Sequence, residues 1–334
     1  MKQHPDRPGS NGPDEIIEMA SGYQKSRIIL TAFELDVFTA IGGGMVSAED
    51  VARTICANAK ATGRLLNALC AIGLIEKKED FFFNTDASAR YLVRGSEEYL
   101  SRIGHMLNLY RTWGTLTEAV RQGGSVTARE YDEVSLVHFI EAMHHRAKKT
   151  SGELVSHIDL DGVKRVLDVG GGSGAYSMAF ARAKDDLHAV VFDLPEVTDL
   201  ARRYITESGL ASRIGTKSGD YNRDDFGSGF DLVFMSAIVH INTPAENRAL
   251  VARAFRALNA GGRIVIQDFI MEEDRTAPAR GALFSLNMLV NTSGGDTYTE
   301  REMREWLAGA GCTEIARIET GMANDLMVGR KPLR

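Results

Sequence analysis

One histidine follows a short apolar run in FMSAIVHINTPAEN, residues 234–247. His240 closes the run, and Thr243, Pro244 and Glu246 have the spacing of a capping box that begins a helix. We therefore expect the strand to end at His240, on a very short loop at the edge where open α/β sheets bind ligands. An imidazole there could remove a proton from a substrate, because its ordinary pKa lies close to neutral pH.

A carboxylate is expected beside this histidine. GRIVIQDF reads as the neighbouring strand, and Asp268 comes at its end, so Asp268 and His240 would share one edge of a parallel sheet. A carboxylate near an imidazole orients the ring and stabilises its charged form. We predict that His240 is a general base supported by Asp268; the alternative is a strand-end histidine bonded only to the backbone.

The strongest local signal is the glycine loop in VLDVGGGSGA, residues 166–175. A strand runs into Gly170, Gly171 and Gly172, and a helix follows at once. Glycines there allow a tight turn and let a ligand touch the backbone. Gly170, Gly172 and Ala175 also satisfy the dinucleotide fingerprint, and a tight turn that binds no ligand is a further alternative.

Three acids favour S-adenosylmethionine (SAM) over a dinucleotide. Asp168 stands inside the glycine motif, where a carboxylate would repel a pyrophosphate but could help hold the amino group of SAM. Asp193 ends a second strand, where it could accept both ribose hydroxyls, as acids of NAD enzymes also do. Asp220 follows a third strand and could accept the adenine amino group, while Tyr221 stacks on the ring. Asp193 and Asp220 could each serve only a turn or a cap; their order along the chain favours SAM.

The elements that must position these residues alternate from residue 165 onward. RVLDV, HAVVFDL, RIGTKSGD, FDLVFMS and GRIVIQDF are apolar and β-branched, whereas AYSMAFARA, EVTDLARRYITES and PAENRALVARAFRALNA have helical periodicity. Strands alternating with helices predict an α/β fold with a doubly wound, Rossmann-like parallel sheet. A further helix, TEREMREWLAGAG, and two extended runs, TEIARIET and DLMVGRK, complete this half.

The first half is mostly helical. Residues 14–95 contain helices with a break near Gly22, a helix that Ser47 could cap, a second short helix that stops at Gly73, and a small hairpin, which is the pattern of a winged helix. We expect a disordered lead-in at 1–13, a winged-helix domain at 14–95, a helical connection at 96–157 that carries pocket helices, and a SAM-binding domain at 158–334.

The overall composition narrows the class of protein. The chain has 334 residues, of which 44% are apolar and 25% charged, with a net charge of −6 that argues against a nucleic-acid-binding surface. Three scattered cysteines give neither a disulfide framework nor a zinc pattern, and we expect no metal site. The polar N-terminus is unlike a signal peptide, and no apolar run approaches the length of a membrane helix. We expect a cytoplasmic protein that binds no membrane.

Six motifs, in this order and spacing, resemble those of the SAM-dependent O-methyltransferases of the plant caffeic-acid and acetylserotonin type, whose bacterial relatives act on polyketide, phenazine and pigment precursors. The motifs are LDVGGGSG, VVFDLPEV, GDY, DLVFMSAIVH, GGRIVIQD and NMLVNTSGGDTYTEREMREWL, and the resemblance covers residues 14 to 331. It implies that the winged helix forms an intertwined homodimer rather than binding DNA, and that His240 is the base. It also implies a metal-free SAM site formed by Gly170 to Gly172, Asp193, Leu194, Asp220 and Tyr221.

The resemblance also assigns positions around the acceptor and marks departures from the family. Ser236, which we place on the cofactor side, stands where plant members have lysine, and Ile241 and Asn242 stand where many members have Asp-Trp. Thr297 replaces a second supporting acid. The pocket for the small-molecule acceptor is expected to include four residues: Met143, Phe284, Asn287 and Met288.

We therefore expect an enzyme that moves a methyl group from SAM to a hydroxyl of a small aromatic or pigment-like molecule. The alternatives are C-methylation of a tetrapyrrole or quinone ring, a SAM-binding enzyme that does not methylate, and a winged-helix regulator that senses SAM. The regulator is disfavoured because its groove helix, residues 60–73, offers only Lys60 and Arg64 to phosphates. Asp168 disfavours a nicotinamide oxidoreductase. His144 and His145 are expected on a solvated face or a domain interface.

Overall fold

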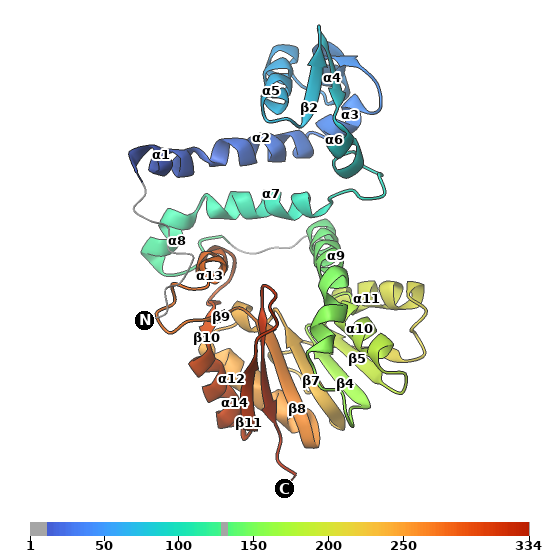
Figure 1. The fold of residues 1–334 in the computed structure, drawn as a ribbon, viewed down its shortest axis with the longest axis vertical. Coiled ribbons are helices and arrows are strands. Elements are labelled where there is room, and N and C mark those ends of the chain that lie inside the picture. The colour runs from blue at the N-terminus through green and yellow to red at the C-terminus, as the bar shows by residue number, and fades with distance from the viewer. Residues whose placement is uncertain (1–11, 128–132, 334) are drawn as a thin grey trace. The chain divides into compact units, whose positions relative to one another are not determined.

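The computed structural model describes residues 12–127 and 133–333, and the chain divides into two compact units at residues 110 and 111 (Figure 1). Most of the expected lead-in at 1–13 lies outside the described residues, as does a short part, 128–132, of the expected helical connection. A helix begins at Pro13. Among the described residues, no helix combines the length and the apolar character needed to cross a bilayer.

The first unit is helical with one small sheet. Its elements are α1 (Pro13–Ser21), α2 (Tyr23–Glu34), α3 (Val37–Ile41), β1 (Val46–Ser47), α4 (Ala48–Thr54), α5 (Ala59–Ala71), β2 (Ile75–Lys78), β3 (Phe81–Asn84) and α6 (Asp86–Tyr91), and α7 (Arg102–Trp113) begins in it. The three strands pair antiparallel in the order β1-β3-β2. The expected helix, turn, helix and hairpin are confirmed, and the Ser47 hydroxyl caps α4 by accepting from the amide of Asp50.

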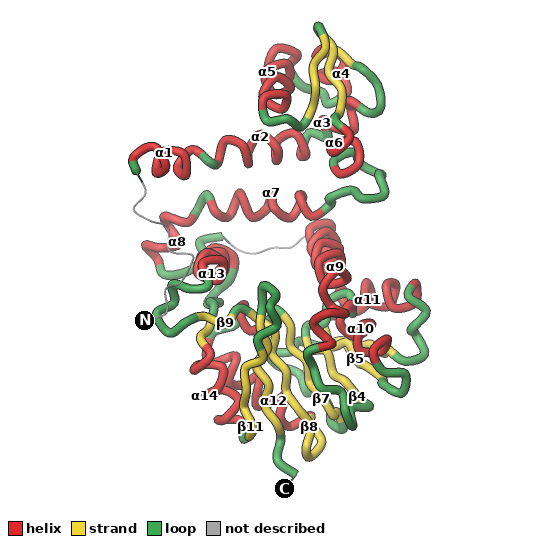
Figure 2. Tube along the Cα trace, viewed as in Figure 1, coloured by secondary structure: helices red, strands yellow, loops and turns green. Residues whose placement is uncertain are grey.

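The second unit alternates strands and helices (Figure 2). Its elements are α8 (Leu116–Gln122), α9 (Glu133–Ser156), β4 (Arg165–Val169), α10 (Ala175–Ala183), β5 (His188–Asp193), α11 (Pro195–Glu207), β6 (Ile214–Ser218), β7 (Phe230–Ser236), the 3₁₀ turn η1 (Val239–Ile241), α12 (Pro244–Ala257), β8 (Leu258–Asp268), β9 (Ile270–Met271), α13 (Ala279–Asn291), β10 (Tyr298–Thr299), α14 (Glu300–Ala310), β11 (Thr313–Ile318) and β12 (Asp325–Arg330).

Seven of these strands form one twisted sheet in the order β11-β12-β8-β7-β4-β5-β6. The five strands from β4 to β8 are parallel, and β11 and β12 are antiparallel additions at one edge. The predicted α/β sheet is confirmed. Because the five strands run the same way, their carboxyl ends meet at one edge, and the segments that follow these strands carry the expected site.

The end of β7 differs from the sequence-based prediction. β7 stops at Ser236, not at His240, because Ala237 takes a left-handed conformation with φ of 57° that turns the chain out of the sheet. The amide of Ala237 still donates to the carbonyl of Gln267 on β8 at 2.9 Å. His240 then lies in η1, and Thr243 and Glu246 form the expected capping box of α12.

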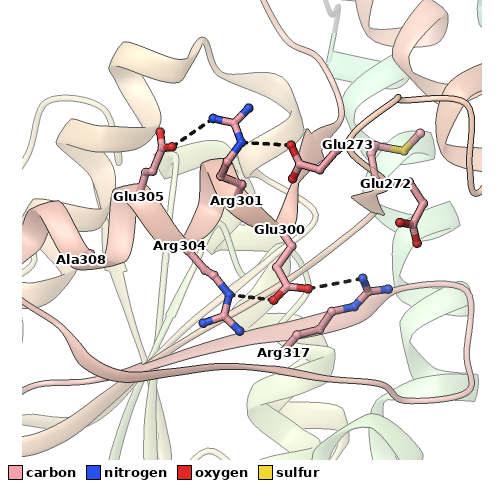
Figure 3. Close-up of a pocket in the computed structure, with 9 residues that line it drawn as sticks. Glu272, Glu273, Glu300, Arg301, Arg304, Glu305, Ala308 and Arg317 are labelled. Carbon is pink, nitrogen blue, oxygen red and sulfur yellow. Dashed lines mark hydrogen bonds and ion pairs between the residues drawn. The ribbon is translucent and has the colours of Figure 1, made fainter.

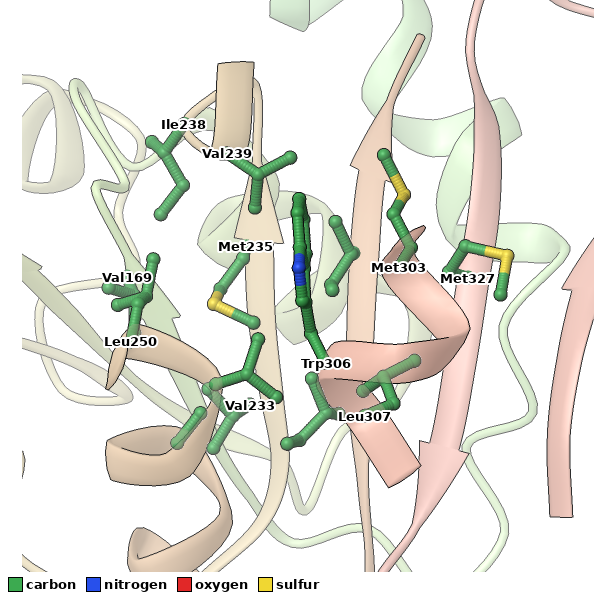
Figure 4. Close-up of a cluster of buried hydrophobic side chains, with 14 of the residues drawn as sticks. Val169, Val233, Met235, Ile238, Val239, Leu250, Met303, Trp306, Leu307 and Met327 are labelled. Atoms are coloured by element: carbon green, nitrogen blue, oxygen red, sulfur yellow. The ribbon is translucent and has the colours of Figure 1, made fainter. Parts of the chain in front are cut away.

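Two hydrophobic layers cover the sheet. Alternate residues of β7 face opposite layers, so Leu232 and Phe234 join one cluster while Val233 and Met235 join the other. In the second cluster Trp306 of α14 lies among the side chains of β7, α12 and the neighbouring strands (Figure 4). This packing fixes α12 and the turn before it, which carries His240, on the sheet.

The packing of α12 predicts a large loss of stability for Leu250→Ala, because Leu250 is fully buried in this cluster. The free energy of unfolding of the second unit should fall by about 2–5 kcal/mol. Denaturant unfolding followed by tryptophan fluorescence would measure it, since Trp306 belongs to the same cluster. Val120→Ala, at a side chain that is 61% exposed, is the control and should change stability by less than about 0.5 kcal/mol. A Leu250→Ala loss as small as that of the control would contradict this role for α12.

Candidate active site

His240 and Asp268 are in direct contact at the carboxyl edge of the sheet. The imidazole Nδ1 of His240 lies 2.9 Å from both carboxylate oxygens of Asp268, and the backbone amide of His240 donates to Oδ2 at 3.4 Å. The amide of Phe269 donates to Oδ1 at 2.8 Å. Both side chains are buried, at 9% and 2% exposure. Because a carboxylate oxygen can only accept, Nδ1 must carry a hydrogen to bond Asp268, and in the neutral form of the ring this leaves the lone pair on Nε2.

An aromatic side chain packs on the same imidazole. The ring of Phe284 meets the ring of His240 nearly at right angles, with centroids 4.9 Å apart, and Phe269 lies 5.0 Å from Phe284. Phe284 comes from α13, so this helix contributes one wall beside the histidine. Apolar contact on the ring and a carboxylate on Nδ1 together restrict its rotation.

The loop that contains Gly295 packs closely against the turn of His240. A Cβ added to Gly295 would lie 2.3 Å from the carbonyl oxygen of His240, so only glycine fits. Thr297, at the position of the second supporting acid, is buried, and its hydroxyl donates to the carbonyl of Gly281 at 3.4 Å. Asp268 is thus the carboxylate that contacts the ring of His240, while Thr297 bonds elsewhere.

The glycine loop has the backbone shape that the sequence predicts. Gly170 and Gly172 have φ of 65° and 56°, which residues with a side chain seldom adopt. A Cβ on Gly170 would collide with Ile238, and one on Gly171 would collide with Asp168. A Cβ on Gly172 would meet no atom within 4 Å, so the loop is open there. The loop is therefore closely packed at Gly170 and Gly171 and open at Gly172, which leaves room for a ligand against its backbone.

Asp168 lies under this loop, at 1% exposure. Its Oδ2 accepts from the amide and the hydroxyl of Ser177 on α10, at 3.2 and 2.7 Å, whereas Oδ1 has no hydrogen-bond partner among the described residues. Burial raises the pKa of Asp168 to about 6, and the nearby Asp193 adds to the rise. A cationic ligand at the loop would favour the ionised carboxylate.

Asp193 ends β5 and ties the glycine loop to this strand. Its Oδ2 accepts from the amide of Gly172 at 2.8 Å and its Oδ1 from the amide of Leu194 at 2.8 Å. Burial raises the pKa of this carboxyl group despite the two bonds. Leu194 itself is exposed and is the N-cap residue of α11. Each carboxylate oxygen of Asp193 keeps acceptor capacity beyond its one amide bond.

Asp220 opens a turn after β6. Its Oδ1 accepts from the amide of Asn222 at 2.8 Å, and its Oδ2 lies 3.4 Å from Arg223. Tyr221 is partly buried against the core, and its carbonyl accepts from Arg253 of α12 at 3.1 Å. These two residues lie past the strand end on the edge shared with Asp193.

The remaining predicted residues are placed as follows. Ser236 ends β7, and its hydroxyl donates to the side-chain oxygen of Gln267. The Asn287 side-chain oxygen, on α13, accepts from the indole nitrogen of Trp113 at 2.9 Å. Met288 is buried at 5% exposure, and Met143 lies half-buried on α9. Of the pocket residues, Phe284 makes a ring contact with His240.

His144 takes a place that sequence reasoning did not predict. Its Nδ1 lies 2.8 Å from the hydroxyl of Ser173 in the glycine loop, and its ring stacks on Tyr204 with centroids 4.1 Å apart. Burial lowers the pKa of His144 to about 4, and His145 and Lys148 add to this. The ring is therefore neutral at pH 7 and half-buried, not solvated. The helical spacing of α9 gave no sign of a contact to a loop 29 residues away.

A separate hollow of about 480 Å³ lies between α14 and β11 (Figure 3). Charged side chains line it, and they pair with one another: Arg301 with Glu273 and Glu305, and Arg304 with Glu300. None of the residues predicted for the site lines this hollow. In the described part of the chain, no group of three or more His, Cys, Asp or Glu side chains could hold a metal ion.

The arrangement fits SAM. An acid under an open glycine loop, a second acid at the next strand end and a third past β6 lie in the order that its amino group, ribose and adenine need. The buried Asp168 oxygen that lacks a donor and the open space above Gly172 are the two observations that carry this fit.

Known proteins are similar to this chain over nearly its whole length. The O-methyltransferase domain matches residues 113–313, and the O-methyltransferase dimerisation domain matches residues 17–94. The chain is 32% identical to the 3-hydroxy-5-methyl-1-naphthoate 3-O-methyltransferase of Streptomyces sahachiroi, over 97% of both chains. It is 28% identical to the tetracenomycin polyketide synthesis 8-O-methyltransferase of Streptomyces glaucescens, over 96% of this chain and 97% of the relative.

A solved structure extends the likeness. Human N-acetylserotonin methyltransferase in complex with SAM superposes with a TM-score of 0.80 at 26% identity, over 98% of this chain and all of the other. The expected kinship is confirmed: the chain belongs to the O-methyltransferase family, as a SAM-dependent enzyme with an N-terminal dimerisation domain.

Proposed function

We propose that this enzyme methylates a phenolic hydroxyl on a small fused-ring aromatic molecule, with His240 as the general base. The observation that carries the proposal is the buried His240–Asp268 pair beside the glycine loop, with both oxygens of Asp268 at 2.9 Å from Nδ1. The names of the two Streptomyces relatives support a naphthoate-like or polyketide acceptor.

Bound SAM supplies a methyl group on a positively charged sulfur, so the leaving group needs no assistance. The acceptor does: a phenol has a pKa near 10 and is mostly protonated at neutral pH. The Nε2 lone pair of His240 takes the phenolic proton, and Asp268 holds the ring in the required tautomer and stabilises the imidazolium that forms. Phe284 keeps the imidazole from turning away.

The residues proposed for the cofactor are those at the ends of β4, β5 and β6. Gly170, Gly171 and Gly172 present backbone to it, and Asp168 favours its ammonium group. Asp193 and Leu194 face the ribose, Asp220 and Tyr221 the adenine, and Ser236 lies at the end of β7. We place Met143, Asn287 and Met288 with Phe284 around the acceptor.

Carbon methylation is the second candidate. Thr297 favours it, because a hydroxyl stands where a second acid would support the histidine. Methylation at a ring carbon of a quinone or tetrapyrrole would require a weaker base than methylation of a phenol. We further infer a homodimer formed through residues 14–95, with no membrane or nucleic-acid partner. A cytoplasmic location is supported by Cys56, Cys70 and Cys312, which are free thiols.

His240→Ala should lower kcat by about 10²–10⁴-fold, because the acceptor would lose its base. The measurement is transfer of labelled methyl from SAM to 3-hydroxy-1-naphthoate, catechols, hydroxyquinones and porphyrins, with the methylated atom identified by mass spectrometry and NMR. Affinity for S-adenosylhomocysteine, the demethylated cofactor, should change by less than about threefold, since His240 serves the acceptor.

His188→Ala is the matched control, because His188 is exposed at the opposite end of the sheet, where β5 begins. It should keep wild-type turnover. Label on carbon, or equal turnover in the His240→Ala variant, would remove His240 from the role of base.

Gly172→Ala should weaken binding of S-adenosylhomocysteine by about tenfold or more, because the new methyl would occupy the open space of the loop. Gly209→Ala is matched: Gly209 also has positive φ, 75°, and open space around it, but lies in a turn after α11. Both variants should lose about 1–2 kcal/mol of stability from backbone strain. Calorimetry that found equal affinities in the two variants would contradict the placement of the cofactor.

Ile17→Asp should convert the dimer to a monomer, because α1 and the start of α2 expose four apolar side chains: Ile16, Ile17, Met19 and Tyr23. A charge placed in a buried apolar contact is strongly unfavourable. Light scattering after gel filtration would distinguish a 36.5 kDa monomer from twice that mass. Met45→Asp, at another exposed apolar side chain of the same unit, should stay dimeric; dissociation of both variants, or of neither, would argue against this surface.

A further inference from the structure

Three asparagine side chains form a buried chain behind the histidine turn. Asn247 of α12 donates from Nδ2 to the carbonyl of Val239 at 2.8 Å. Asn242 donates from Nδ2 to Oδ1 of Asn247 at 3.2 Å, and Asn222 donates from Nδ2 to Oδ1 of Asn242 at 3.3 Å. Asn247 and Asn242 are almost completely buried. The chain links residues that are 25 positions apart in the sequence.

The direction of these bonds is fixed by chemistry. The Val239 carbonyl can only accept, so Asn247 must turn its NH₂ group toward it and its oxygen toward Asn242. The same reasoning then orients Asn242 and Asn222 in turn. The last oxygen, Oδ1 of Asn222, is buried without a hydrogen-bond partner among the described residues. A buried acceptor without a hydrogen bond costs free energy, so these three asparagines are less favourable for stability than apolar side chains of the same size would be.

Each end of the chain lies at a turn that the proposed reaction uses. At one end the amide of Asn222 donates to the carboxylate of Asp220, on the cofactor side. At the other end Val239 directly precedes His240 in η1. In the middle, the carbonyl of Asn242 accepts from the hydroxyl of Tyr298 in β10, three residues after Gly295. Asn242 therefore connects three segments: the turn at Asp220, the turn at His240 and the loop from Gly295 to Tyr298.

We propose that Asn242 is a positioning residue for methyl transfer, which holds the His240 turn in register with the Asp220 turn through Asn247 and Asn222. It acts through His240 and touches no reacting atom. The proposal rests on His240 being the base. Methyl transfer needs the acceptor oxygen, methyl carbon and sulfur in line, and a misplacement near 1 Å can cost about 10²-fold in rate. The hydrogen bonds of Asn242 between the two turns would fix the distance between the acceptor oxygen and the methyl carbon.

The test compares Asn242→Leu, Asn222→Leu and their double variant with wild type. Leucine keeps approximately the volume of asparagine but cannot hydrogen-bond. Each single variant should lower kcat for 3-hydroxy-1-naphthoate by about 10–100-fold, while calorimetric affinity for S-adenosylhomocysteine changes by less than about threefold. The double variant should be no slower than the slower single variant, because both substitutions break one connection. Unchanged binding would also show that the variants fold.

A second measurement needs no acceptor. The Nδ1 proton that His240 shares with Asp268 should give a low-field proton resonance in ¹⁵N-histidine-labelled protein, assigned by its loss in His240→Gln. It should broaden or move upfield in Asn242→Leu and Asn222→Leu, because the turn is no longer held. Asn259→Leu is the matched control, since the exposed side chain of Asn259 donates to Asp231, away from the three asparagines. Its spectrum and kcat should match wild type.

The outcomes separate the two proposals. A wild-type resonance that persists unchanged in both single variants, with kcat within about twofold of wild type, would overturn the positioning role of Asn242. The wild-type protein could instead transfer no methyl to any of these acceptors, while the resonance is lost in both single variants. That result would support the link through Asn242 and reject the proposed function.

Discussion

The parallel pairing of β4, β5, β7 and β8 is the constraint on which the site depends. The predicted site residues from Asp168 to Asp268 lie along one edge because their strands are parallel and end there. The contact between His240 and Asp268 requires that β7 and β8 stay in register, and the bond from Gly172 to Asp193 requires the same of β4 and β5. The hydrophobic layers on both sides of the sheet maintain that register, and the chemistry depends on it.

The loops at this edge are held by hydrogen bonds to carboxylates and amides rather than by apolar packing alone. Asp193 bonds the glycine loop, Asp268 bonds the histidine turn, and the hydroxyl of Ser173 bonds His144 on α9. The first two bonds each join segments at the ends of two neighbouring strands, and the third joins the loop after β4 to the helix before it. Such cross-links place catalytic groups more accurately than a loop could do by itself, since each bond restricts distance and direction.

The sequence predicts the strands and most of the site, but it does not predict the contacts that depend on tertiary structure. The strands, the glycine loop and the acids at strand ends were predictable because alternation, glycine and carboxylates leave local patterns. The left-handed Ala237 was not, because an alanine at positive φ has no sequence signal, and the prediction therefore extended β7 to His240. The bond of His144 to Ser173 and the asparagine chain were also missed. Both depend on tertiary contacts between segments whose spacing in the sequence is arbitrary.

The close approach of Gly295 to the carbonyl of His240 has a consequence for how such an enzyme can change its acceptor. A side chain at Gly295 would meet the backbone oxygen of His240 at 2.3 Å, so the turn that holds His240 against Asp268 would have to move. This loop therefore has no room for a larger residue next to the His240–Asp268 pair. Side chains of α13, from which Phe284 contacts the ring of His240, can vary without moving that backbone, so changes of acceptor are expected in this helix rather than in the loop.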